Sequence, residues 1–217
     1  MNNNQIKSKQ RVSDYGEVFT AEREVNAMLD LVKHETERID SRFLEPACGE
    51  GAFLKEILRR KLTVVKDKYG KSTSDYEVNS VKAVCSIYGI DILEDNAQIC
   101  RNNLYEIWNK EYTKLAKKDA TDKCRNTVKF ILSKNIICGN ALTMLCNDDS
   151  PIIFAEWIFI ENNVKRRDFR LDELVSNELT TEVFVENWHY DEETNAFLPN
   201  PIKDYPVTNY LELSNYE

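Results

Sequence analysis

The stretch that decides the fold is Phe43-Leu44-Glu45-Pro46-Ala47-Cys48-Gly49-Glu50-Gly51-Ala52-Phe53-Leu54. It predicts the end of a buried strand, a tight turn with two glycines and the first turn of a helix. Gly49 and Gly51 permit backbone angles that a side chain forbids, and they let a ligand approach the main chain. The N–H groups at the start of the helix would face that ligand. Glu45 stands at the carboxyl end of the strand, where open α/β sheets bind ligands. A G-x-G turn by itself is equally compatible with an ordinary strand–helix connection.

The whole run resembles the motif that binds S-adenosylmethionine (AdoMet) in amino-methylating DNA methyltransferases, above all in the adenine-N6 enzymes of restriction–modification systems. That family's pattern is an acidic residue, Pro, a small residue, Cys or Ala, Gly, a variable residue and Gly, followed by apolar residues. Glu50 departs mildly from the pattern, because Ser or Thr is commoner there. The resemblance implies an α/β fold, a Rossmann-like AdoMet-dependent methyltransferase sandwich with a mainly parallel sheet. In this run it implies that the cofactor-binding residues are Glu45, Ala47, Gly49, Gly51 and Phe53.

A second stretch precedes the glycine turn. From the residues alone, Thr20 is a good N-cap for a helix from Ala21 to about Ile39. In the same family a segment with Gly, an aromatic residue, Thr and Pro stands before the AdoMet loop and covers the cofactor. Gly16, Phe19 and Thr20 match that segment, whereas Ala21 replaces its proline. The resemblance therefore adds Phe19 and Thr20 to the cofactor-binding residues, although an ordinary capped helix remains the alternative.

Two further stretches follow in the order that the family shows. Asp91 ends a predicted strand, and a carboxylate there can accept hydrogen bonds from both ribose hydroxyls. The resemblance implies that Asp91 binds the ribose of AdoMet and that Ile92 packs on the adenine. It also implies that Asn140 and Ala141, after the next strand, meet the adenine. Taken alone, Asp91 could cap a helix, and Gly-Asn before Ala141 could be a simple turn.

Alternating strand and helix patterns predict the rest of the first domain, residues 1–170. We expect strands at about 42–45, 81–90, 131–138 and 152–159, with helices on both faces of the sheet. Helices are expected from 52 to 66 and from 94 to 118. The polar residues 68–79 predict a surface excursion, and residues 1–13 are expected to be loose.

Composition places the chain among soluble globular proteins. Its 217 residues suffice for one α/β domain, and 42% are hydrophobic while 30% are charged. No apolar run approaches the roughly 20 residues of a membrane helix, and the first ten residues contain no signal-peptide core. We therefore expect a cytoplasmic protein without a membrane partner. The six cysteines form no C-x-x-C pair and only two histidines are present, so we expect buried, reduced thiols and no metal site.

The net charge of −8 resides in the C-terminal segment. Residues 171–217 hold 11 acidic residues and one basic residue, Lys203, whereas the rest of the chain is close to neutral. This segment is therefore predicted to be an acidic extension that packs loosely, on the same domain or against a partner. Its expected apolar contacts are Val183, Phe184, Trp188 and Phe197.

The catalytic motif of the family is not recognisable. It consists of Asn, Asp or Ser, then Pro-Pro and an aromatic residue, and it holds the flipped adenine. The chain contains no Pro-Pro. Asp149-Ser150-Pro151-Ile152 lacks the second proline and the aromatic residue, and Asn162 is only a degenerate candidate for the polar position. The catalytic residues thus stay unknown, and residues 165–217 are too short for an independent target-recognition domain.

Two classes of function fit these observations. The first is an AdoMet-binding DNA adenine-N6 methyltransferase-like protein of a restriction–modification system, which needs a specificity or catalytic partner to act on DNA. The second is a non-catalytic subunit of a methylation or restriction complex, either one that binds AdoMet or one whose acidic segment mimics DNA. The oligomeric state and the recognition site do not follow from the sequence.

Overall fold

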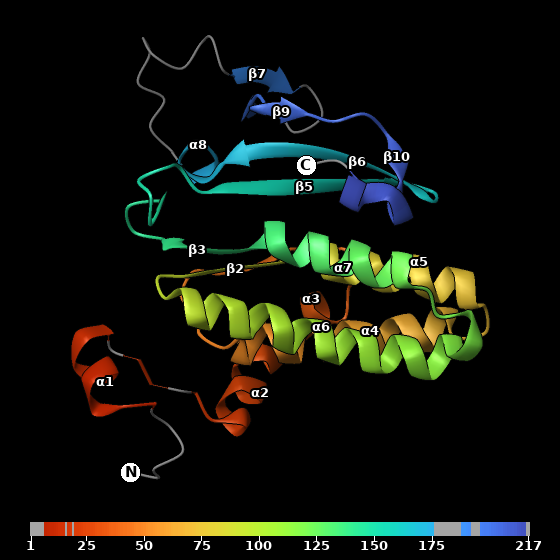
Figure 1. Cartoon of the computed structure of the whole chain (residues 1–217), viewed down its shortest axis with the longest axis horizontal. Coiled ribbons are helices and arrows are strands. Elements are labelled where there is room, and N and C mark those ends of the chain that lie inside the picture. Colours follow the sequence, from red (N-terminus) through yellow and green to blue (C-terminus); the bar gives the residue numbers. More distant parts are fainter. Residues whose placement is uncertain (1–6, 16, 19, 176–187, 192–195, 216–217) are drawn as a thin grey trace.

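A parallel sheet of three strands forms the centre of the protein (Figure 1). The computed structural model describes residues 7–15, 17–18, 20–175, 188–191 and 196–215. The strands β1 (Phe43–Glu45), β2 (Ile87–Asp91) and β3 (Ile136–Asn140) lie in the order β1-β2-β3, and the short β4 (Leu145–Cys146) pairs antiparallel to β3. All residues of β2 are buried, as expected of the middle strand of a parallel sheet. The fold is mixed α/β with a mainly parallel sheet, as predicted.

Two pairs of helices connect these strands. The pair α4 (Ala52–Tyr69) and α5 (Thr73–Cys85) joins β1 to β2, and the pair α6 (Glu94–Ala116) and α7 (Asp122–Asn135) joins β2 to β3. A 3₁₀ turn, η1 (Lys117–Asp119), separates α6 from α7. The α4 and α6 helices pack on the parallel sheet, whereas α5 and α7 run almost directly into β2 and β3.

The α5 and α7 helices contradict the sequence-based assignment. Residues 68–79 were predicted as a surface excursion and 81–90 as a strand, but α5 occupies 73–85 and the strand begins at Ile87. Likewise α7 extends to Asn135, so the predicted strand 131–138 begins only at Ile136. The α5 helix is buried on several sides, which hides the 3.6-residue period of an amphipathic helix. The α7 helix does bury Cys124, Val128 and Ile131 at helical spacing, and the sequence analysis overlooked this stripe. Their N-caps were the missed signal, because Ser72 and Thr121 each accept a hydrogen bond from a backbone N–H three residues later.

A long hairpin covers the other side of the parallel sheet. Its strands are β5 (Ile153–Ile160) and β6 (Asn163–Arg170), so a strand at about 152–159 is confirmed, but it belongs to a separate antiparallel sheet. The hydroxyl of Tyr88 on β2 donates to the carbonyl of Ala155 (2.9 Å), and the indole of Trp157 donates to Asn135 Oδ1 (2.9 Å). Figure 1 shows β5 and β6 on one side of β2 and β3, with α4 and α6 on the other.

The N-terminal region consists of three short helices. They are α1 (Lys9–Tyr15), α2 (Glu22–Asp30) and α3 (Lys33–Thr36), so a single helix from 21 to 39 was wrong. The N-cap of α2 is Ala21 and not Thr20, and the side chain of Glu24 accepts a hydrogen bond from the Ala21 N–H (3.4 Å). The prediction of a loose segment 1–13 also fails for residues 9–13, which belong to α1.

The C-terminal segment packs on this domain where it is described. After α8 (Leu171–Val175), β7 (Trp188–Asp191) pairs with β8 (Ala196–Pro199), while β9 (Lys203–Asp204) and β10 (Thr208–Asn209) pair with β6. The 3₁₀ helix η2 (Tyr210–Asn215) packs against α7 and buries Tyr210 and Leu213. Residues 203–215 therefore lie against the same domain, which is one of the two expected alternatives, and these two apolar side chains anchor them. Val183 and Phe184 lie outside the described residues.

The helices of the described residues are all too short or too polar to cross a membrane. Four of the six cysteines are buried, which agrees with their predicted place in the core.

A buried carboxylate holds the C-terminal segment on the domain, and the stability lost when one of its hydrogen bonds is removed can be measured. Glu77 on α5 accepts hydrogen bonds from the hydroxyls of Tyr112 and Tyr210, the latter at 2.5 Å. The substitution Tyr210→Phe should lower the free energy of unfolding by about 1–3 kcal/mol, because it leaves a buried acceptor with one donor fewer. Chemical denaturation measures this change. The matched control is Glu212→Ala, which breaks the exposed ion pair with Lys123 and should cost less than about 1 kcal/mol. Equal losses in the two variants would contradict this anchoring role.

A buried lysine gives the stability a pH dependence. Lys61 on α4 is fully buried, donates to the carbonyl of Ile39 (3.2 Å) and to Ser86 Oγ (2.7 Å), and burial lowers its pKa to about 7. Between about pH 7 and 10 the unfolded chain holds a proton that the folded chain lacks, so this group makes stability rise with pH and fall as pH drops through that window. The free energy of unfolding of the wild type, relative to Lys61→Met, should therefore increase from about pH 7 to 9. Parallel pH profiles of the two proteins would show that Lys61 does not titrate in this range.

Candidate functional site

The two glycines of the turn have different roles in the structure. Both have positive φ, 52° at Gly49 and 81° at Gly51, and Gly51 is the N-cap of α4. A Cβ on Gly51 would lie 2.7 Å from Cys100 Sγ, which belongs to α6. A Cβ on Gly49 would meet no described atom within 4 Å. Gly51 therefore serves the packing of α4 on α6, whereas Gly49 leaves the backbone open to an approaching ligand.

The turn is fastened to the end of β2 by its own backbone. The N–H of Cys48 donates to the carbonyl of Ile90 (2.8 Å), and the N–H of Gly49 donates to Asp91 Oδ2 (2.8 Å). Gly89 makes this close approach feasible, because a Cβ there would lie 3.0 Å from Cys48 Sγ. The turn that follows β1 is thus hydrogen-bonded to the carboxyl end of β2.

Asp91 is a buried carboxylate that several hydrogen bonds hold in place. Besides Gly49, it accepts hydrogen bonds at Oδ1 from the Leu93 N–H (2.9 Å) and from Asn96 Nδ2 (3.3 Å). The residue is only 8% exposed. Since a carboxylate offers about four acceptor positions, Oδ2 keeps one for a ligand donor.

A network from the N-terminal segment lies over the same region. Asn96 donates to Glu17 Oε1 (2.6 Å) and accepts from Lys7 Nζ (2.7 Å), and Lys7 also pairs with Glu50 of the turn (2.8 Å). Arg11 on α1 forms two hydrogen bonds with Asp95 (2.6 and 2.9 Å), and these hold the pKa of Asp95 well below its usual range. Sequence analysis missed this network, because isolated basic residues in a polar segment carry no distinctive pattern.

Two ionisable groups near the turn have a raised pKa. Burial raises the pKa of Glu45, although a hydrogen bond from the Ala47 backbone opposes the shift. A hydrogen bond with the Cys100 thiol, together with burial, raises the pKa of Cys48 far above its usual value. Cys48 is therefore an unreactive thiol and a packing residue in this site.

The third strand supplies the remaining predicted residues. Asp91 is paired with Cys138, so Asn140 lies two residues beyond that pair at the same edge of the sheet. Asn140 Oδ1 accepts from the Leu142 N–H (2.9 Å), and its carbonyl accepts from the Met144 N–H (2.8 Å), which shapes the turn into β4. Ile92 is 43% exposed and Ala141 is half-buried.

The predicted residues consequently divide into three sets. The carboxyl ends of the three parallel strands bring together Glu45, Ala47, Gly49, Gly51, Asp91, Ile92, Asn140 and Ala141. Phe53 lies in the first turn of α4, and Thr20 is partly buried just before α2. Phe19 and Gly16 lie outside the described residues.

The degenerate catalytic candidate is not part of this site. Asn162 occupies the turn between β5 and β6, and its carbonyl accepts a hydrogen bond from the N–H of Tyr210 in η2 (3.1 Å). Figure 1 shows this end of the hairpin, beside β10, on the opposite side of the molecule from the ends of β2 and β3. Asn162 is therefore a structural residue of the hairpin turn.

The arrangement has features that a nucleoside cofactor requires. An open glycine backbone lies beside a carboxylate with a remaining acceptor position, and an exposed apolar side chain and an amide side chain stand nearby. Comparisons with protein-family models, with curated proteins and with solved structures found no match for this chain.

The unequal roles of the two glycines can be separated by a pair of substitutions. Gly49→Ala should destabilise the protein by about 1 kcal/mol, which is the cost of a Cβ at positive φ. Gly51→Ala should cost about 1–2 kcal/mol more, because its Cβ also collides with Cys100 Sγ. The double variant Gly51→Ala/Cys100→Ala should recover part of that difference in denaturant unfolding. Equal losses for Gly49→Ala and Gly51→Ala would contradict the contact with Cys100.

Proposed function

We propose that this chain is an AdoMet-binding, DNA adenine-N6 methyltransferase-like protein of a restriction–modification system, with a Rossmann-like domain in the cytoplasm. The observation that carries the proposal is the hydrogen bond from the Gly49 N–H to Asp91 Oδ2, beside an open position over Gly49 at the carboxyl ends of three parallel strands. Ligands of open α/β sheets bind at this edge. Several nucleoside ligands could bind at such an edge, and the sequence resemblance favours AdoMet among them.

Each predicted residue has a role in this proposal. Asp91 accepts a hydrogen bond from the ribose, Gly49 leaves room for the methionine portion, and Ile92 and the Asn140 turn hold the adenine. Gly51 acts indirectly, because its contact with Cys100 lets α4 begin at the turn. Phe19 and Thr20 close the site from the N-terminal side. AdoMet, when bound, would supply an electrophilic methyl group. The residues of this chain bind and orient it, while the Lys7–Arg11 network keeps the turn and the start of α6 together.

Methyl transfer to adenine would require residues from a partner. The chain has no Pro-Pro, and Asn162 lies in a hairpin turn remote from Asp91. A specificity or catalytic partner would therefore supply the polar group that accepts hydrogen bonds from the flipped adenine, and would read the DNA site.

The competing function is a non-catalytic subunit of a methylation or restriction complex that binds AdoMet without transferring its methyl group. The remote position of Asn162 favours it over a self-sufficient enzyme. The DNA-mimicking version has less support, because several acids of the C-terminal segment form ion pairs within the chain. These are Asp172 with Arg170, Asp204 with Lys165 and Glu212 with Lys123.

Titration calorimetry with AdoMet and with its demethylated product tests the cofactor proposal. We expect one molecule per chain, with a dissociation constant below about one millimolar. Asp91→Ala should weaken binding by about 1.5–3 kcal/mol, the range for a hydrogen bond to a charged group. The control is Glu94→Ala, which removes an exposed carboxylate of the same charge three residues later and should bind as the wild type does.

The absence of binding by the wild type would reject the cofactor proposal and leave a structural subunit. If AdoMet binds, a DNA methylation assay with and without candidate partner subunits separates the two remaining functions. Transfer of a labelled methyl group only with a partner supports the split enzyme, and binding without transfer under any combination supports the non-catalytic subunit.

A further inference from the structure

The first strand of the parallel sheet has one open edge. The N–H of Phe43 donates to Ser86 at the start of β2 (2.9 Å), so the hydrogen-bonding groups of Phe43 face β2. Because these groups alternate in direction along a strand, the N–H and C=O of Leu44 point to the other side. Among the described residues, β2 is the only strand that pairs with β1, and Leu44 is 45% exposed. A strand edge with free backbone groups is a template for pairing with another chain.

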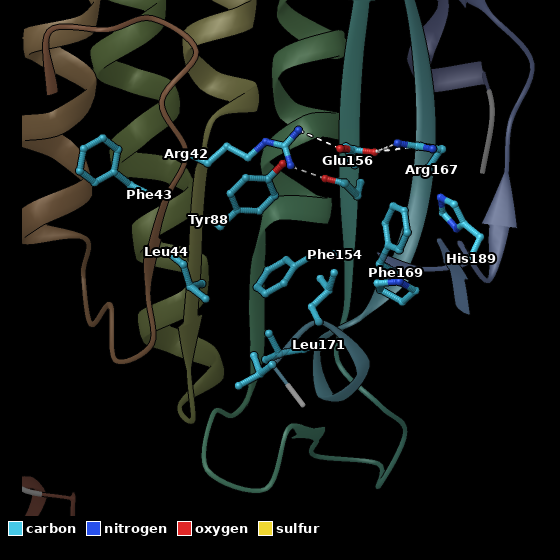
Figure 2. Close-up of a pocket in the computed structure, with 14 residues that line it drawn as sticks. Arg42, Phe43, Leu44, Tyr88, Phe154, Glu156, Arg167, Phe169, Leu171 and His189 are labelled. Carbon is cyan, nitrogen blue, oxygen red and sulfur yellow. Dashed lines mark hydrogen bonds and ion pairs between the residues drawn. The ribbon is translucent and has the colours of Figure 1, made fainter. Parts of the chain in front are cut away.

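An apolar cavity adjoins this edge. It has a volume of about 580 Å³ and lies between β1 and β2 on one side and the β5–β6 hairpin on the other, as Figure 2 shows. Leu44 and Tyr88 line the first wall, and Phe154 and Phe169, which are paired across the hairpin, line the second. Leu171, Leu174 and Val175 add aliphatic surface at one end. Alternate side chains of an extended peptide could enter such a cavity while its backbone pairs with Leu44.

The charges beside the cavity are unbalanced. Arg42 and Arg167 both pair with the single carboxylate of Glu156, with N–O distances of 2.8 Å and 2.6 Å. Figure 2 shows the three side chains in one row above Phe154 and Phe169. Arg42 remains 60% exposed, so one positive charge of this row is accessible. A bound molecule with a carboxylate at this position would pair with the exposed guanidinium of Arg42.

We propose that the open edge of β1 binds an extended, acidic–apolar segment of a partner polypeptide by β-strand addition. The partner strand forms backbone hydrogen bonds with Leu44, inserts apolar side chains between Tyr88, Phe154 and Phe169, and places a carboxylate at Arg42. Recognition of this kind takes affinity from the backbone and specificity from the pockets for alternate side chains. A second copy of this chain fits less well, because it would bring another Arg42 and Arg167 towards the first pair.

The docking site is independent of the cofactor proposal. None of the residues that line the cavity belongs to the predicted AdoMet-binding set. Peptide binding can therefore be measured without AdoMet, and failure of one proposal leaves the other intact.

The probe is a set of labelled peptides of about eight residues in which threonine alternates with valine, isoleucine, leucine or phenylalanine, with one glutamate near the centre. Fluorescence anisotropy should show binding by at least one member below about one millimolar, with roughly tenfold weaker binding when lysine replaces the glutamate. The same peptide with N-methylated backbone amides should not bind, because it cannot form the ladder. Absence of binding by the whole set, or equal binding of the N-methylated form, would overturn the proposal.

Two variants of the protein locate the site. Leu44→Pro removes the outward N–H and leaves the pairing groups of Phe43 in place, so affinity should fall about tenfold relative to Leu44→Ala, which keeps that N–H. Arg42→Glu should reverse the preference, so that the lysine peptide binds more tightly than the glutamate peptide. Arg42 is exposed, and this charge reversal therefore tests the site even if the proline variant does not fold. An unchanged preference in Arg42→Glu would contradict docking at this edge.

Hydrogen exchange and sedimentation distinguish the other occupants. In the protein alone the amide of Leu44 should exchange rapidly, and it should become protected when the peptide is added. Protection without any peptide in a monomeric protein would show that the same chain covers the edge. A concentration-dependent dimer that Leu44→Pro abolishes would show that the occupant is a second copy, and either result would overturn the partner proposal.

Discussion

The carboxylate of Asp91 accepts hydrogen bonds from two parts of the chain: from Gly49 in the glycine turn, and from Leu93 and Asn96 at the start of α6. It thereby fixes the end of β2 against the end of β1 and sets the direction in which α6 begins. Asn96 extends the same network to Glu17 and Lys7, so the N-terminal segment is positioned by the group that orders the turn. Burying a carboxylate without these hydrogen-bond donors would cost free energy. Folded arrangements that leave Asp91 without them are therefore disfavoured.

Around this point the fold uses its helices in two ways. The α4 and α6 helices cover the parallel sheet, whereas α5 and α7 deliver the chain into β2 and β3 with almost no connecting loop. Asn135, the last residue of α7, donates to the carbonyl of Ile87 (3.0 Å) and accepts from Trp157 of the hairpin. The polar end of one helix therefore aligns the central strand with the antiparallel sheet. This contact helps to hold the small parallel sheet between the layer of α4 and α6 and the layer of the β5–β6 hairpin.

Sequence reasoning located those elements whose signal is local. The glycine turn, β1, the start of α4 and the long α6 follow from turn residues and from a one-sided apolar stripe. The α5 helix escaped it, because Val81, Ala83 and Cys85 alternate like a strand while being buried inside a helix. The α7 helix was missed although its buried residues recur at helical spacing. Asp91 and Asn140 were found by their order along the chain, but the contact between Cys100 and Gly51 joins residues that only the fold brings together. The pairing of residues 203–209 with β6 is equally non-local, and two-residue strands leave no pattern to detect.

Lys61 has a consequence beyond its own titration. Its ammonium group is bonded to the carbonyls of Ile39 and Ser41, immediately before β1, and stands 5.2 Å from the centre of the Phe43 ring. A three-residue strand that pairs with one strand among the described residues would ordinarily fray at its ends. Here Lys61 holds the residues just before β1 from inside the core. The edge of β1 is therefore already ordered before any other strand pairs with it. Because the receiving strand is already ordered, the conformational entropy lost on pairing is that of the incoming strand, in addition to the translational and rotational entropy that every association costs.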